Sequence, residues 1–270
     1  MAAPHPQRQR AAKARLALLL AQPSTVYVVH DACQSIRSSD KQGTDLQGSP
    51  RVGSIAVRNV DSGQTLSFSI HQELELAGIP PRAAAQYMDR LERAMLDRFF
   101  NFLRVDKGMR FVHWHMRDLT FGFTALEHRH TRLGGTPYVI ADHQRHDLAI
   151  LTAEIYGTDY LPRPLLKSLA ERNGISRAGF LEGAAEPDAF DRGLYFAVLQ
   201  STQCKVTIIA DVCRRIHDNT LATDASKWTR NVGKVREALQ LFDNNPVYAW
   251  SSLLFGAVAA SFGLFFRWLS

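Results

Sequence analysis

The chain has 270 residues, of which 46% are hydrophobic and 21% are charged, and it carries a formal net charge of +6. This length and apolar content suffice for one large buried core or two small ones, so disorder is not the default expectation for this chain. The cysteines at positions 33, 204 and 213 have no C-x-x-C spacing, which argues against a zinc knuckle or a disulfide framework and favours a reducing compartment. The positive charge suits a polyanion or an anionic membrane surface as partner.

Residues 1–24 form a basic N-terminal segment. Within it, Arg8, Arg10, Lys13 and Arg15 are followed by a short apolar run. That run lies at the lower length limit of a signal peptide and leads into a strand-like sequence without a small-residue cleavage site. We therefore expect a basic first helix here rather than a cleaved signal.

Three strands are expected next, over residues 25–30, 51–60 and 64–71. Each is rich in β-branched and aromatic residues or alternates between apolar and polar positions. The first strand ends beside Asp31, and the Asp-Ser-Gly turn at 61–63 predicts a hairpin between the second and the third. Residues 35–50 are rich in Ser, Asp and Gly, which is typical of a long loop.

Helices are expected further along the chain, over residues 81–104, 121–133, 147–156, 165–172 and 190–217. The first has a helical apolar period, and the last is expected to break near Ser201. Between the first two helices, residues 110–116 (RFVHWHM) are expected to form a strand with His113 and His115 on one face, a pair more typical of ordinary hydrogen bonding than of metal binding. This order of elements predicts a mixed sheet with helices packed on it.

A single transmembrane helix is expected over residues 246–270. Its sequence from 247 to 269, VYAWSSLLFGAVAASFGLFFRWL, contains one charge, Arg267. About 20 apolar residues suffice to cross the hydrocarbon core of a bilayer. Trp250 and Trp268 lie near the two ends, where indole rings favour the interface.

The residues before this span predict its orientation. Residues 218–245 form a juxtamembrane linker with several Lys and Arg residues, whereas only three residues follow Arg267. Positive charge favours the cytoplasmic side, so we expect a single-pass protein of the cell membrane with residues 25–217 as a cytoplasmic domain. Small residues in the span would allow two copies to pack closely, which makes a homodimer an open alternative.

Several segments between residues 27 and 214 carry a family resemblance. The first strand ends in an acid (VVHDACQSI), a later strand runs into a helix (FVHWHMRDLTFGF), and DLAILTAEIYG and LLKSLAERNGI follow. This layout resembles the ribonuclease H-like fold of the DEDD 3′-5′ exonucleases, the proofreading-exonuclease superfamily. The resemblance implies an α/β domain with a ribonuclease H-like mixed sheet flanked by helices.

The resemblance also implies a metal-dependent reaction. Enzymes of that superfamily hold two Mg²⁺ or Mn²⁺ ions with four carboxylates, one ion activating water and the other stabilising the leaving oxygen. Asp31 matches the first acid of the family and Asp118 matches the acid of its second motif. If the site is active, these two residues are the expected metal ligands, and Asp31, Asp118 and Lys205 are the expected catalytic residues.

The sequence departs from the family at the remaining positions. Cys33 stands where the family has Glu, and the closing His and Asp align on Gln200 and Lys205. The Lys205 ammonium would repel the second metal ion and take its place electrostatically. A shifted alignment leaves three other acids as candidates for the missing ligand, Asp188, Asp191 and Asp211.

Basic residues after the second motif are candidates for nucleic-acid binding. His128, Arg129 and Arg132 lie on one expected helix, and Arg145 lies in the next basic cluster. Such residues contact phosphates, although the same pattern is also typical of a solvated basic surface, because no regularly interleaved aromatic residues accompany it.

The sequence therefore leaves two candidate functions. The first is a membrane-tethered 3′-5′ exonuclease-like domain that acts on nucleic acid or binds it, with catalysis degenerate at Cys33 and Lys205. The alternative is a non-catalytic interaction or signalling module that positions a protein partner at the membrane.

Overall fold

The computed structural model describes residues 6–33, 50–105, 107–116 and 121–224. Its centre is a five-stranded mixed sheet of β1 (Val26–Cys33), β2 (Val52–Asn59), β3 (Thr65–Ser69), β4 (Arg110–His113) and β5 (Arg145–Asp147), in the order β3-β2-β1-β4-β5. The β1–β2 and β2–β3 pairs are antiparallel, whereas β1–β4 and β4–β5 are parallel. The direction of pairing therefore changes at the central strand, β1.

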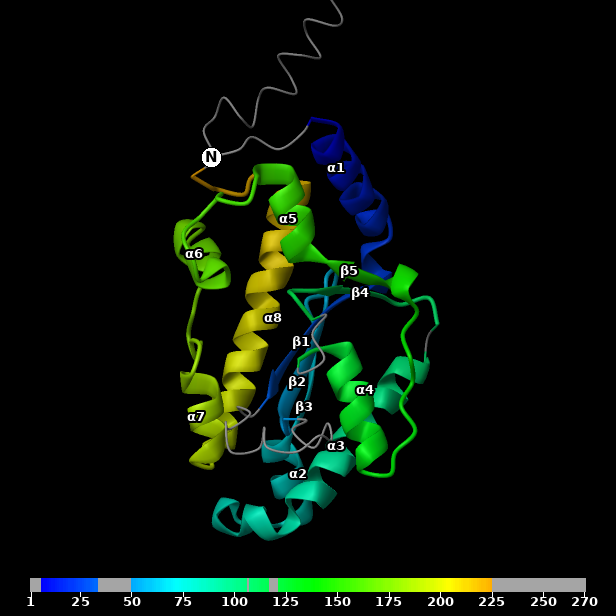
Figure 1. The fold of residues 1–270 in the computed structure, drawn as a ribbon, viewed down its shortest axis with the longest axis vertical. Helices are drawn as coiled ribbons and strands as arrows, with labels where there is room; N and C mark the ends of the chain where they lie inside the picture. The colour runs from blue at the N-terminus through cyan, green and yellow to red at the C-terminus, as the bar shows by residue number, and fades with distance from the viewer. Residues whose placement is uncertain (1–5, 34–49, 106, 117–120, 225–270) are drawn as a thin grey trace, which may run out of the picture. The chain divides into compact units, whose positions relative to one another are not determined.

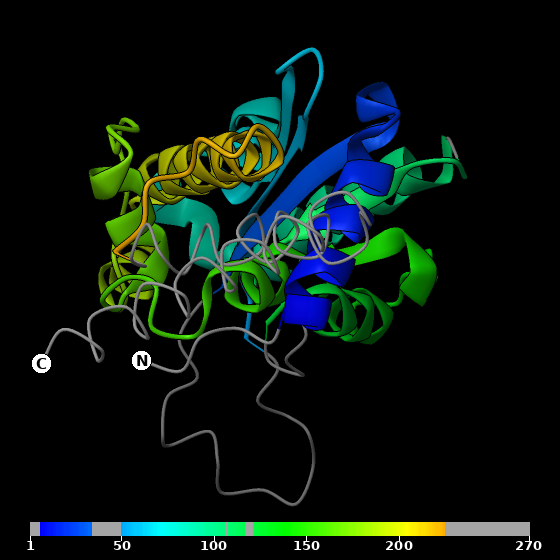
Figure 2. The ribbon, with the colours of Figure 1, turned by 90° about the horizontal axis from the view of Figure 1, so that it is seen from above.

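Eight α-helices lie in the described ranges: α1 (Pro6–Leu20), α2 (Ile70–Ala77), α3 (Met88–Val105), α4 (Phe123–Arg132), α5 (Leu148–Tyr156), α6 (Leu165–Arg172), α7 (Ala185–Asp191) and α8 (Tyr195–His217). Short 3-10 helices cover Pro23–Thr25, Pro81–Tyr87 and Asp142–Gln144. Helix α8 packs on one face of the sheet and α3 and α4 pack on the other (Figure 1; Figure 2 shows the same layers from above). The expectation of a mixed sheet flanked by helices is confirmed.

Alternation along the strands builds the two cores. Val28 of β1 and its partner Val112 of β4 lie in the core beneath α8, α5 and α1. Val29 and Phe111 lie in the core beneath α3 and α4. Because successive side chains of a strand point to opposite faces, each buried strand supplies both cores.

The first half of the chain follows the predicted elements closely. The basic N-terminal helix, the three strands and the hairpin at 61–63 are all present. The third strand is shorter than expected, because the Ser69 side chain accepts a hydrogen bond from the backbone of Gln72 and so caps α2. The helix expected over 81–104 begins as a 3-10 helix and becomes α-helical only at Met88.

Two expectations were wrong in detail. The strand over 110–116 ends at His113, and His115 has a positive φ of 57° outside the strand, so the two histidines do not share a strand face. The long helix over 190–217 is interrupted at Gly193, whose φ of 74° suits glycine, rather than near Ser201. Sequence reasoning also missed the three-residue strand β5.

The C-terminal predictions fall largely outside the described residues. The expected transmembrane span over 246–270 lies there, together with the linker from residue 225. Within the described ranges, no helix has the length and apolar character needed to cross a bilayer. Residues 218–224, assigned to the linker from sequence, pack on the domain, where Leu221 is buried and the Asp224 backbone N–H donates to Tyr160.

Candidate functional site

The carboxyl ends of β1, β4 and β5 meet at one edge of the sheet. His113 and Asp147 are the last residues of β4 and β5 and are paired in register, and Asp31 lies two residues before the end of β1. By alternation all three belong to the face that α3 and α4 cover. Ligands of open α/β sheets bind outside the carboxyl ends of strands where the topology switches, which makes this edge the candidate site.

Asp31 is a fully buried carboxyl group at this edge. Its Oδ2 accepts hydrogen bonds from the backbone N–H of Gly122 and the thiol of Cys33, each at 3.4 Å. Its Oδ1 is buried and has no hydrogen-bond partner among the described residues. Burial raises the pKa of Asp31 to about 7, partly offset by the bonds from Cys33 and Gly122. Burial therefore favours the protonated form of Asp31 compared with an exposed carboxyl group.

Lys205 pairs with a carboxylate that sequence reasoning had not considered. Its Nζ donates to Glu186 Oε1 at 2.7 Å, and the Ser201 hydroxyl donates to the same oxygen at 2.6 Å. The charge of Glu186 contributes to the raised pKa of Asp31, which places the pair near the Asp31 carboxyl. Glu186 precedes the exposed acids of α7 by only a few residues, and nothing in the sequence distinguishes it from them.

The three alternative acids lie away from this pair. Asp188 is exposed and pairs with Arg192, Asp191 is exposed, and Asp211 pairs with Arg215 within α8. Asp118, the second expected ligand, lies outside the described residues. The acids of the shifted alignment thus face solvent or their own helix.

The donors described around Asp31 do not fit a two-metal centre. Hard cations such as Mg²⁺ need several oxygen ligands, and only one oxygen of Asp31 is without a partner here. Cys33 offers a soft thiol whose pKa burial raises well above its usual value, and Glu186 is already neutralised by Lys205. In the described ranges, no cluster of three or more His, Cys, Asp or Glu side chains is arranged to hold a metal ion.

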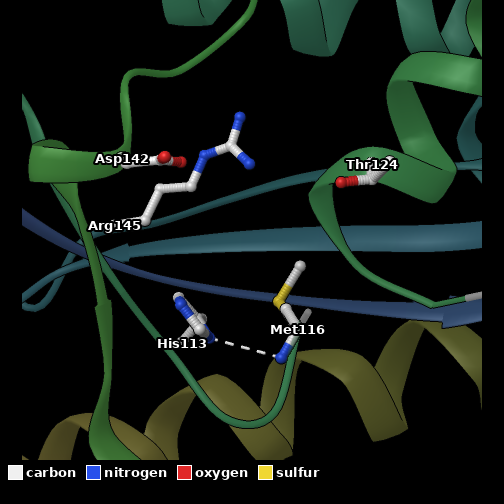
Figure 3. A pocket seen from close by; sticks show the side chains of 5 residues that line it. All are labelled: His113, Met116, Thr124, Asp142 and Arg145. Carbon is white, nitrogen blue, oxygen red and sulfur yellow. Dashed lines mark hydrogen bonds between the residues drawn. The ribbon is translucent and has the colours of Figure 1, made fainter. Parts of the chain in front are cut away.

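A pocket of about 390 Å³ opens beside the ends of β4 and β5 (Figure 3). It is lined by His113, Met116, Thr124, Asp142 and Arg145. His113 Nδ1 accepts a hydrogen bond of 3.3 Å from the Met116 backbone N–H. This bond fixes the orientation of the imidazole ring against the turn that follows β4. Thr124 belongs to the first turn of α4, so this helix points its N-terminus toward the pocket.

Arg145 is the cation of this pocket. Its Nη2 donates to Glu127 Oε1 at 2.8 Å, and its guanidinium lies 5.0 Å from the centre of the Phe123 ring. The ion pair and the ring together hold the side chain in one orientation. Its Nε is buried and has no hydrogen-bond partner among the described residues.

The other predicted nucleic-acid contacts do not line the pocket. Arg129 is buried and binds Glu92 with two hydrogen bonds of 2.6 and 2.7 Å, which link α4 to α3. His128 and Arg132 are exposed on the outer side of α4. Of the four basic residues chosen from sequence, the structure brings only Arg145 to the candidate site.

Comparisons with known proteins give no match to this chain, whether among family models, curated proteins or solved structures. We therefore infer its function from its own residues and their geometry.

Proposed function

We propose that this chain is a membrane-tethered domain of ribonuclease H-like fold that binds single-stranded nucleic acid and does not cleave it by a two-metal reaction. The observation that carries the proposal is the Arg145 pocket at the carboxyl ends of the parallel strands. The tether is the apolar segment 246–270.

The strand arrangement supports the fold. Three antiparallel strands, β1 to β3, are followed by two parallel strands on the other side of β1, in the order β3-β2-β1-β4-β5. This agrees with the layout that suggested a ribonuclease H-like domain, in which the first strand is central and ends with an acid. Asp31 lies near that position, two residues before the end of β1.

The pocket supports nucleic-acid binding. An arginine guanidinium binds phosphate oxygens through paired N–H donors, and a helix N-terminus adds backbone N–H groups and a partial positive charge. Arg145 and Thr124, in the first turn of α4, both line the pocket, and among the described residues no side chain caps the N–H groups of that turn. The net charge of +6 attracts a polyanion over longer distances.

The neighbourhood of Asp31 supports binding without cleavage. A thiol stands at the position of one family ligand, and the carboxylate whose charge acts on Asp31, that of Glu186, is already paired with Lys205. A carboxyl group of raised pKa and a carboxylate that already has a cation partner both oppose the binding of two divalent ions. The same residues also support a non-catalytic interaction module, which is therefore the second candidate function.

Binding of a fluorescent single-stranded oligonucleotide to the full chain in detergent, followed by anisotropy over a salt series, tests the proposal. We expect Arg145→Gln to weaken binding about tenfold and to lower the salt dependence by about one phosphate contact. Glu127→Gln removes the carboxylate that competes for Arg145 and should tighten binding. If the pair were only structural, both substitutions would weaken binding alike.

The same samples test cleavage. Arg192→Gln, an exposed cation remote from the pocket, serves as the control and should leave affinity unchanged. Trimming of the oligonucleotide in Mg²⁺ or Mn²⁺ that disappears in Asp31→Asn would overturn the non-cleaving version. Binding that is absent or insensitive to salt, together with capture of protein partners, would favour the interaction module.

A further inference from the structure

Helix α1 presents a surface of cations without a single acid. Its exposed cations are Arg8, Arg10, Lys13 and Arg15, and its exposed apolar residues are Ala11, Ala14, Ala17 and Leu18. The opposite side of the helix is fixed to the domain through Ala12, Leu16 and Leu19, which are buried in the core beneath α8 and α5. These buried contacts fix α1 on the domain, so its exposed side has a defined position on the domain surface.

This surface lies at the end of the domain where the described chain stops. Lys13 Nζ donates to Asn219 Oδ1 at 3.0 Å, which joins α1 to the turn after α8. The last described residue, Asp224, is hydrogen-bonded to Tyr160 just after α5. Figure 1 and Figure 2 show α1, α5 and the C-terminal end of α8 together at one end of the domain.

Several acids at this end of the domain form ion pairs, mostly with cations outside α1. Glu154 pairs with Arg15, and the other acids pair with cations outside α1: Asp211 with Arg215, Asp218 with His217, and Asp224 with Arg172. The last turn of α8 adds Arg214 and Arg215 to the cations nearby.

We propose that α1 lies on the surface of an anionic lipid bilayer, with its cations against lipid headgroups and Leu18 at the boundary of the acyl region. The proposal rests on the proposed membrane tether. Roughly 20 residues separate Asp224 from the expected span, and a chain of that length reaches at most about 70 Å when fully extended. The described chain therefore ends at, and continues toward the proposed tether from, the end of the domain that α1 occupies.

The chemistry of the surface favours lipid over nucleic acid as its partner. Helix α1 has no aromatic residue on which a base would stack. It has instead an exposed leucine, which is 73% accessible, flanked by small apolar residues and by cations. Interfacial helices bind anionic membranes through this combination of Lys and Arg with apolar side chains.

A probe on α1 tests the proposal in the full chain. The chain carrying Ala14→Cys is labelled with an environment-sensitive dye and reconstituted into nanodiscs of phosphatidylcholine, with or without phosphatidylserine. We expect the dye to shift to the blue and to be quenched by lipid-borne quenchers only in the anionic nanodiscs, with the effect reversed by salt. A dye at Ala85→Cys, exposed in the 3-10 helix before α3, should not respond.

Charge variants test whether the response depends on the cations of α1 or on the net charge of the whole protein. The Arg8→Gln, Arg10→Gln, Lys13→Gln triple variant should lose the response at position 14, because each basic residue near an anionic surface contributes roughly fivefold to binding, or about 100-fold for three. The control with Arg82→Gln, Arg90→Gln and Arg192→Gln loses the same charge on exposed positions elsewhere and should keep the response. Glutamine preserves helix propensity in both.

The outcomes distinguish this inference from the tether. A chain that inserts into nanodiscs but whose dye at position 14 never responds retains the tether and overturns the inference. If the full chain fails to insert, the tether is wrong, and binding of the same chain to preformed anionic vesicles decides the inference through the triple variant. A triple variant that loses oligonucleotide binding while vesicle binding is unchanged would assign the surface to nucleic acid and overturn the proposal.

Discussion

Lys205 donates a hydrogen bond of 2.7 Å to Glu186, on α7. This buried ion pair lies near Asp31 but does not include it. The cation at an expected metal-ligand position therefore has a carboxylate partner of its own. That arrangement changes what substitutions at position 205 are expected to do.

Lys205→Met should destabilise the fold strongly, because it leaves the Glu186 carboxylate buried without a cation. Removing one partner of a buried pair costs about 3–5 kcal/mol. Lys205→Met combined with Glu186→Gln should recover most of this loss, since the amide still accepts from Ser201. Urea unfolding of the three proteins measures both effects. Equal stabilities for the single and double variants would show that the pair does not form.

The pKa of Asp31, about 7, predicts an unusual pH dependence of stability. The folded state binds more protons than the unfolded state between the ordinary carboxyl pKa near 4 and 7. The Asp31 contribution to the free energy of unfolding should therefore be complete below pH 4 and fall as pH rises to 7. The loss amounts to up to about 4 kcal/mol by linkage.

Asp31→Asn isolates this contribution. Buried His30 has a lowered pKa, through burial and the charge of Lys205, and so favours folding at higher pH. The difference between wild type and Asp31→Asn cancels the terms that both proteins share. We expect the variant to gain stability relative to wild type between pH 5 and about 7 in urea titrations. A constant difference across that range would exclude a raised pKa for Asp31.

Arg129 is expected to act on stability rather than on ligand binding. Its guanidinium is buried and binds both oxygens of Glu92, which also accepts from the Val52 backbone. Arg129→Ala should lower the free energy of unfolding by about 3–5 kcal/mol. Arg132→Gln, on the exposed side of the same helix, should change it by less than about 0.5 kcal/mol. Loss of oligonucleotide affinity in a fully folded Arg129→Ala protein would contradict this assignment.

Gly122 has a backbone conformation that suits glycine and a hydrogen bond to the carboxyl group of Asp31. Its φ is 99°, its N–H donates to Asp31, and a Cβ there would lie 2.5 Å from the carbonyl carbon of Met116. Gly122→Ala should therefore cost at least about 2 kcal/mol, from strain and displaced backbone together. Gly78→Ala is the matched control, since it also has positive φ but open space around it, and should cost about 1 kcal/mol. Thermal unfolding compares the two.

Local patterns in the sequence predicted most of the secondary structure. The β-branched run around Val28 and the helical period of α3 follow from side-chain alternation and burial, which act over a few residues. Strand β5 escaped prediction because three residues carry too little pattern, and its pairing with β4 exists only in the folded sheet. The end of β4 at His113 depends on the turn to α4 in the same way.

The sequence by itself determined the basic first helix, the strand that carries Asp31 and the apolar C-terminal segment, because the pattern of each lies in a short contiguous stretch of residues. Only the tertiary structure decided which charges meet. Glu186 reaches Lys205, Glu92 reaches Arg129 and Glu127 reaches Arg145 across different elements. Burial and partner choice are properties of packed neighbours far apart in the chain, so the difference between an arginine that lines a pocket, Arg145, and one bonded in the interior, Arg129, appears only after folding.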